Sequence, residues 1–143
     1  AGVILEKEMA AGRIETNKKN LEILLQAWMS AMEYERAVKT IDRLGPLADD
    51  GKYFMRKAGI HNELGEWSQV IVAVKQALEK GVEDTADAHM LAGMAYTELE
   101  QFSEALKAFR EARNAGNDRQ RKNASAWIGF VQEKIALKGA TLS

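Results

Sequence analysis

The sequence has no cysteine among its 143 residues and only one proline. Because there is no cysteine, disulfide bonds and thiol chemistry are excluded, although any cellular compartment remains compatible. A single proline leaves few places where a helix must end, and residues that favour helices occur nearly throughout. These features predict an all-α protein.

Net charge and long apolar runs are also scarce. The formal net charge is -1, which gives no overall attraction to nucleic acid or to acidic membranes. The longest apolar run in the interior covers residues 70–74, far short of the roughly 20 residues that span a bilayer. We therefore expect no nucleic-acid partner and no direct insertion into a membrane. The composition, 46% apolar and 29% charged, suits a folded chain.

A pattern of residue sizes recurs along the chain. The segment GMAYTELEQFSEALKAFREA (93–112) is echoed by AGIHNELGEWSQVIVAVKQA (58–77) and more weakly by LEILLQAWMSAMEYERAVKTI (21–41). The alignment places Tyr96, His61 and Trp28 at the same position. Three units with a period of about 34 residues predict an α-helical repeat protein.

Each unit is predicted to be two helices joined by a tight turn. In the third unit, the small residues Gly93 and Ala105 allow the two helices to approach closely, and neighbouring aromatic residues fill the space beside them. The turn falls at Glu100–Gln101. Gly81 and Gly116 are expected to end the second helices in the left-handed conformation that favours glycine.

Further helices are predicted on both sides of the units. Apolar residues near the start suggest one before the first unit, and a longer one after the third has a polar outer side that can close a stack. We therefore divide the single domain into a flanking helix (1–16), three units (17–49, 50–84 and 85–117) and a capping helix (118–138).

Residues 93–112 resemble a tetratricopeptide repeat (TPR), and the likeness extends over about residues 17–117. The first unit departs from the pattern with Leu25 at the glycine position, and the second with Ala58. The resemblance implies a right-handed α-solenoid of about three TPR helix pairs, whose first helices line a concave groove where partners bind. The residues that match in the third unit are Gly93, Tyr96, Phe102, Ala105, Phe109 and Ala112.

The inward positions implied by this resemblance give the candidate groove. Its methionines would form an adaptable apolar surface, because flexible thioethers mould to varied partners. The other interpretation is that they fill the core between helices. Trp127 and Phe130 on the capping helix are a further surface if exposed, although core packing is favoured for Trp127. The candidate partner-binding residues are Met29, Met55, Asn62, Met90, Met94, Thr97 and Glu98.

Residues for catalysis, metal binding or cofactor binding do not group in the sequence. His61 and His89 are isolated, and neither has a second histidine at metal-ligand spacing. We expect no enzyme activity, no metal and no cofactor. Some TPR proteins hold chaperone carboxylates with a clamp of lysine, asparagine and arginine. Here the clamp positions carry Glu22, Gln26, Met55 and Gly59, so an adaptor of that type is disfavoured.

A second resemblance is to the C-terminal part of exported bacterial TPR proteins that accompany TonB–ExbB–ExbD systems. It is carried by AGRIETNKKNLEILLQAWMSAMEYERAV, ALEKG, AGMAYTELEQFSEALKAFREA and DRQRKNASAWIGFV. It implies that the chain is part of a longer periplasmic protein whose partner belongs to the TonB system; the alternative location is the cytoplasm. The function expected is a non-enzymatic protein–protein interaction scaffold, with a self-association module as the alternative.

Overall fold

The computed structural model describes residues 1–142, and for residues 140–142 it describes the backbone alone. Within this range the chain forms eight α-helices, one short 3₁₀ helix and no β-strand. The elements are α1 (Gly2–Ala10), α2 (Lys18–Ser30), α3 (Tyr34–Leu44), η1 (Gly45–Leu47), α4 (Lys52–Glu63), α5 (Trp67–Lys80), α6 (Thr85–Glu98), α7 (Phe102–Ala115) and α8 (Asp118–Leu142).

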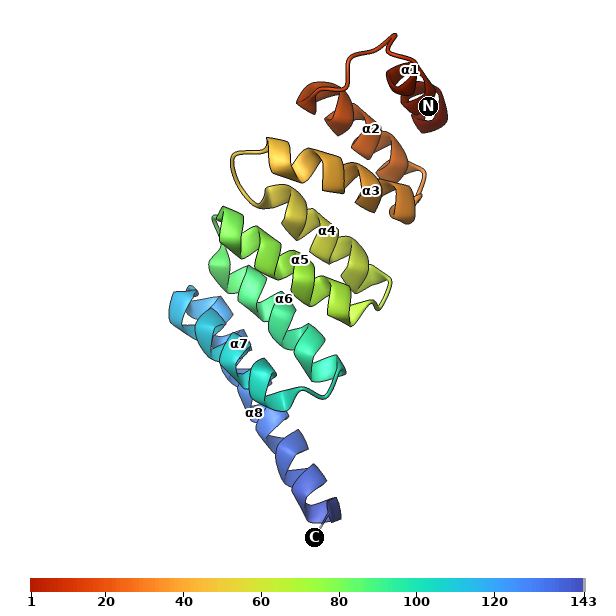
Figure 1. Cartoon of the computed structure of the whole chain (residues 1–143). Helices are drawn as coiled ribbons and strands as arrows, with labels where there is room; N and C mark the ends of the chain where they lie inside the picture. The colour runs from red at the N-terminus through yellow and green to blue at the C-terminus, as the bar shows by residue number, and fades with distance from the viewer. Residues whose placement is uncertain (143) are drawn as a thin grey trace.

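The helices stack in chain order, with the two termini at opposite ends of the molecule (Figure 1). Each helix packs against the helices before and after it in sequence, and α8 also touches α6. This is an all-α solenoid. The capping helix continues to Leu142, past the predicted end at residue 138. It extends beyond the stack, and its side chains from Gln132 to Gly139 are all exposed.

The turn within each unit has the same backbone geometry in all three units. One residue adopts a φ between 56° and 69°, and the residue after it donates its N–H to the carbonyl five positions earlier, at 2.9 Å. The alignment predicted from the sequence is therefore confirmed at this point of the fold. The residues with positive φ are Met32, Gly65 and Glu100, and the accepting carbonyls belong to Trp28, His61 and Tyr96.

The close approach predicted at Gly93 is present between α6 and α7. A Cβ atom built on Gly93 would lie 2.6 Å from the ring of Phe109, which is fully buried. At the corresponding places α4 has Ala58 and α2 has Leu25, both also fully buried. The third unit therefore places an aromatic ring where the absence of a side chain leaves room.

The connection between α7 and α8 differs from the prediction. Gly81 ends α5 with a φ of +98°, as expected, but Gly116 is extended, with φ -86° and ψ 164°. The prediction of a left-handed Gly116 is wrong because only Gly116 and Asn117 join the two helices. Glycine serves a close approach here instead, since a Cβ atom would lie 2.7 Å from the Cβ atom of Gln120.

The start of the chain also differs from the prediction. The helix expected over residues 1–16 ends at Ala10, and Gly12 follows with a φ of +77°. The segment between α1 and α2 is not helical, and the side chain of Asn17 caps α2 by accepting a hydrogen bond from the N–H of Asn20 at 2.8 Å. An N-cap of this kind begins a new helix rather than continuing the previous one.

We predict that Gly93→Ala lowers the free energy of unfolding by about 1–3 kcal/mol, because the added methyl group overpacks the contact with Phe109. The matched control is Gly59→Ala in α4, where no atom lies within 4 Å of the added Cβ atom. That change should stabilise the protein by up to about 1 kcal/mol, since alanine is the better helix former. Urea denaturation followed by circular dichroism measures both. Equal stability of the two variants would contradict the packing described.

Candidate functional site

The predicted groove residues all lie on first helices but belong to different parts of the core. Met29 is on α2, Met55 and Asn62 are on α4, and the remaining four are on α6. The four methionines are all half-buried. Met29 packs against one core cluster, Met55 against a second, and Met90 and Met94 against a third. The structure therefore brings Met90 and Met94 together and leaves the other two methionines apart from them.

The third core cluster borders a cleft between α6 and α8. Two cavities of about 240 Å³ each share Phe130, on α8, in their linings: one is lined by residues of α8 alone, and the other lies between α8 and the end of α6 with the turn that follows it. Thr97 and Glu98, two of the predicted site residues, line one of them. We call the combined surface the α6–α8 cleft; its lining residues are Thr97, Glu98, Glu100, Phe102, Ala126, Trp127, Phe130 and Lys134.

A chain of aromatic contacts holds the cleft in place. Trp127 stacks on the buried ring of Phe109, with centroids 5.4 Å apart and planes at 13°. Phe130 meets Trp127 edge to face at 5.6 Å and 86°. Trp127 is half-buried, in agreement with the expected core packing, whereas Phe130 remains 42% exposed. An aromatic ring at the surface is thus supported from beneath by rings in the core.

Charged side chains surround these rings. The ammonium group of Lys134 lies 5.2 Å from the ring centroid of Phe130, and that of Lys138 lies 5.7 Å from the centroid of Phe102. Such distances are typical of cation–π contacts. Glu98 and Glu100 are exposed, and within the part of the chain that the structure describes neither carboxylate forms an ion pair.

A hydrogen bond between side chains joins α2 and α4, the first helices of the first two units. The phenol of Tyr53 on α4 donates a hydrogen bond to the carboxylate of Glu22 on α2, and the ammonium group of Lys52 lies 5.1 Å from the Tyr53 ring centroid. Burial, followed by the hydrogen bond to Glu22, raises the pKa of Tyr53 to about 12. The carboxylate of Glu22, at an inward position of the predicted groove, therefore already accepts a hydrogen bond from Tyr53.

We predict that the stabilising effect of the Tyr53 phenol is lost at alkaline pH. The folded protein keeps this proton up to about pH 12, whereas the unfolded chain loses it near pH 10. The contribution is therefore full below about pH 10 and declines as the pH rises through the folded pKa.

Tyr53→Phe should cost about 1 kcal/mol at neutral pH, and the difference from the wild type should shrink between about pH 10 and pH 12. Urea unfolding at several pH values measures this difference, with Tyr34→Phe as the control for removing a phenol elsewhere. A difference that does not vary with pH would rule out the raised pKa.

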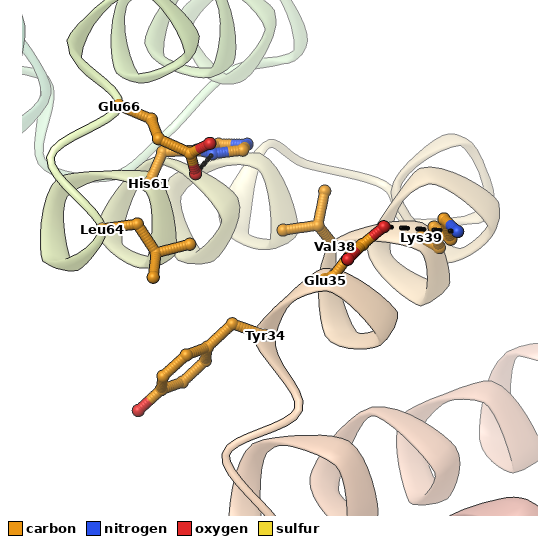
Figure 2. A pocket seen from close by; sticks show the side chains of 7 residues that line it. All are labelled: Tyr34, Glu35, Val38, Lys39, His61, Leu64 and Glu66. Carbon is orange, nitrogen blue, oxygen red and sulfur yellow. Dashed lines mark hydrogen bonds and ion pairs between the residues drawn. The ribbon is translucent and has the colours of Figure 1, made fainter.

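Three further cavities lie between neighbouring helices of the stack. Figure 2 shows the largest of the three, about 500 Å³, where His61 and Glu66 lie side by side and the ring of Tyr34 turns away. The His61 Nδ1 atom is 3.1 Å from the Glu66 carboxylate, and Glu35 pairs with Lys39 at 3.7 Å. The side chains of His61 and Glu66, and those of Glu35 and Lys39, are thus already paired with each other.

The other two cavities follow the repeat. One of about 400 Å³ is bordered by Trp28, and one of about 220 Å³ by Tyr96. Trp28, His61 and Tyr96 occupy equivalent places in the repeat, and each of the three cavities has one of them in its lining. His61 is buried at this place and packs between helices.

Among the residues that the structure describes, no group of three or more histidine, aspartate and glutamate side chains is arranged to hold a metal ion. None of the described helices combines the length and the apolar character that crossing a bilayer requires.

Comparison with solved structures gives TPR proteins. The TPR2B domain of yeast Sti1 in complex with pHsp70 matches with a TM-score of 0.67 at 15% identity, over 82% of this chain and 97% of that chain. A MamA double mutant (RS-1 ArsTM) matches at 0.72 and 18%, over 94% and 74%. PcrH in complex with the chaperone binding region of PopD matches at 0.66 and 19%, over 81% and 91%.

These likenesses establish a TPR-like fold, because identities this low carry the fold alone. They indicate no catalytic family. No family model and no curated protein sequence matches the chain.

Sequence reasoning found part of this site. It placed Met90, Met94, Thr97 and Glu98 on the correct helix and noted Phe130 as a possible surface residue. It missed Ala126, Phe102, Glu100 and Lys134 as lining residues. The signal that could have found Lys134 is its spacing of four residues from Phe130 on one helix face.

Proposed function

We propose that the protein is a non-enzymatic protein–protein interaction scaffold that holds a peptide or helix along its first-helix face, anchored in the α6–α8 cleft. The observation that carries this proposal is the exposed ring of Phe130, which lines both cavities and is supported by Trp127 and Phe109. Exposed aromatic residues held by a packed base are typical anchors of binding energy.

The remaining predicted site residues extend this surface in the proposal. Met90 and Met94 pack against the same core cluster as Trp127, so their accessible parts adjoin the cleft. Met29, Met55 and Asn62 would contact a longer partner farther along the stack. A groove of this type can bury about 800 Å² on each partner, which is enough for a specific complex.

Two of the similar structures are complexes with segments of other proteins. The Sti1 domain is with pHsp70, and PcrH is with the chaperone binding region of PopD. They support the proposal by analogy of fold. The carboxylate clamp is absent from the predicted positions here, and Glu22 is held by Tyr53, so the partner chemistry differs from a clamped carboxylate.

We predict that peptides selected on the folded protein from a phage-displayed random library bind at the cleft. Phe130→Ala should weaken their binding at least tenfold, or about 1.4 kcal/mol, without changing the helical content. Ala126→Arg fills the same cavity from an exposed position and should act likewise. Charged substitutions at Met90 or Met94 are unsuitable because both pack against the core.

The matched control is Val72→Ala on α5, which removes an apolar side chain of comparable exposure, 55%, away from the cleft. Peptides that bind both cleft variants as well as the wild type would refute this placement of the site.

A finer proposal is that the partner belongs to a periplasmic TonB system. Its support is the resemblance of residues 11–38, 77–81, 92–112 and 118–131 to exported TPR proteins that accompany such systems. Calorimetry with the periplasmic part of TonB should give a dissociation constant of about 1 μM or tighter, and Phe130→Ala should abolish the heat. A folded protein that gives no heat would leave the general scaffold without this partner.

Self-association is the other candidate function. Ile4 on α1 is 68% exposed and Val3 is 49% exposed, so the first helix presents an apolar side to solvent. Phe130 does the same at the other end of the stack. Light scattering over a range of concentrations separates this candidate from partner binding, because a scaffold for other proteins can remain a monomer.

A further inference from the structure

We infer that the segment bound in the α6–α8 cleft is basic: it carries arginine or lysine beside an aromatic or aliphatic anchor. This inference rests on the proposed function and specifies the chemistry of the partner. It is drawn from the lysines that contact the rings of Phe102 and Phe130 and from the carboxylates near these rings that form no ion pair.

Two of the three aromatic rings of the cleft, those of Phe102 and Phe130, are in contact with cations of the protein itself. The ammonium groups of Lys134 and Lys138 lie 5.2 Å and 5.7 Å from the ring centroids of Phe130 and Phe102. The face of an aromatic ring is electron-rich and attracts cations. The two lysines therefore mark positions where a cation of a partner is also stabilised.

These internal contacts are easily exchanged. Both lysines are exposed and lie on the part of α8 where every side chain from Gln132 to Gly139 is exposed. An arginine of a partner can replace them, because a guanidinium group is planar, stacks on aromatic faces and is more weakly hydrated than an ammonium group.

Two carboxylates next to the rings lack a cation. Glu98 and Glu100 line the cleft, and neither forms an ion pair with another described residue. Glu100 lies in the turn between α6 and α7, where its backbone has a positive φ. A basic side chain over Phe130 would meet these carboxylates, which strengthens its hold by complementary charge.

The opposite charge fits the cleft less well. An acidic partner would lie near the carboxylates of Glu98 and Glu100, which have the same charge. In the largest of the other cavities, Glu35 is already paired with Lys39 and His61 lies beside Glu66.

The test uses three amidated nonapeptides, SLXFGLXSG, in which X is arginine, glutamine or glutamate. Binding to the full chain is followed by NMR through the indole N–H of Trp127 and the amide of Thr97, at low and high salt. The arginine peptide should bind at least tenfold more tightly than the glutamate peptide at low salt, and high salt should reduce this preference.

The preference should depend on the two carboxylates. Glu98→Gln combined with Glu100→Gln should reduce it at least fivefold. The control is Glu79→Gln combined with Glu83→Gln, which removes two exposed charges outside the cleft and should leave the preference unchanged.

Other outcomes separate this inference from the proposed function. Equal binding of all three peptides, or tighter binding of the glutamate peptide, with shifts at Trp127 and Thr97 overturns the basic partner and retains the scaffold. If no peptide shifts either signal while the protein is folded, the cleft is not the binding site and both proposals fail.

Discussion

The contact between Gly93 and the ring of Phe109 is the constraint on which the C-terminal half of the structure depends. Because the glycine has no side chain, the ring lies where a methyl group would otherwise be. Trp127 stacks on that ring and Phe130 meets Trp127 edge to face. In this repeat a small residue packs opposite a large one. This packing thereby determines the position of the exposed ring of Phe130.

The sequence predicted most of the architecture because a repeat leaves a mark at each helix crossing. Trp28, His61 and Tyr96 are three different residue types, yet the backbone carbonyl of each accepts the same turn hydrogen bond. Size and spacing were sufficient to align them. What the pattern could not supply was the path of the chain between units. Gly116 fits a left-handed helix end equally well by sequence, and only the short connection to α8 makes it extended.

The candidate site was predictable in part for a related reason. Thr97 and Glu98 follow from the repeat, since their helix and their inward position are properties of the unit. The contribution of α8 does not follow, because this helix lies outside the three units and has no pattern to align with. Its Phe130 joins the cleft because α8 packs against α7 and α6.

The overhang of α8 has a consequence for how the surface responds to contact. A helix segment whose side chains are all exposed has little tertiary packing to oppose local opening. Fraying of this end can therefore occur without unfolding the stack behind it. The rings of Phe102 and Phe130 lie on the packed side of that boundary, whereas Lys134 and Lys138, which contact them, lie on the exposed segment. The base of the cleft is therefore supported by the core, and its lysine contacts are carried by this segment.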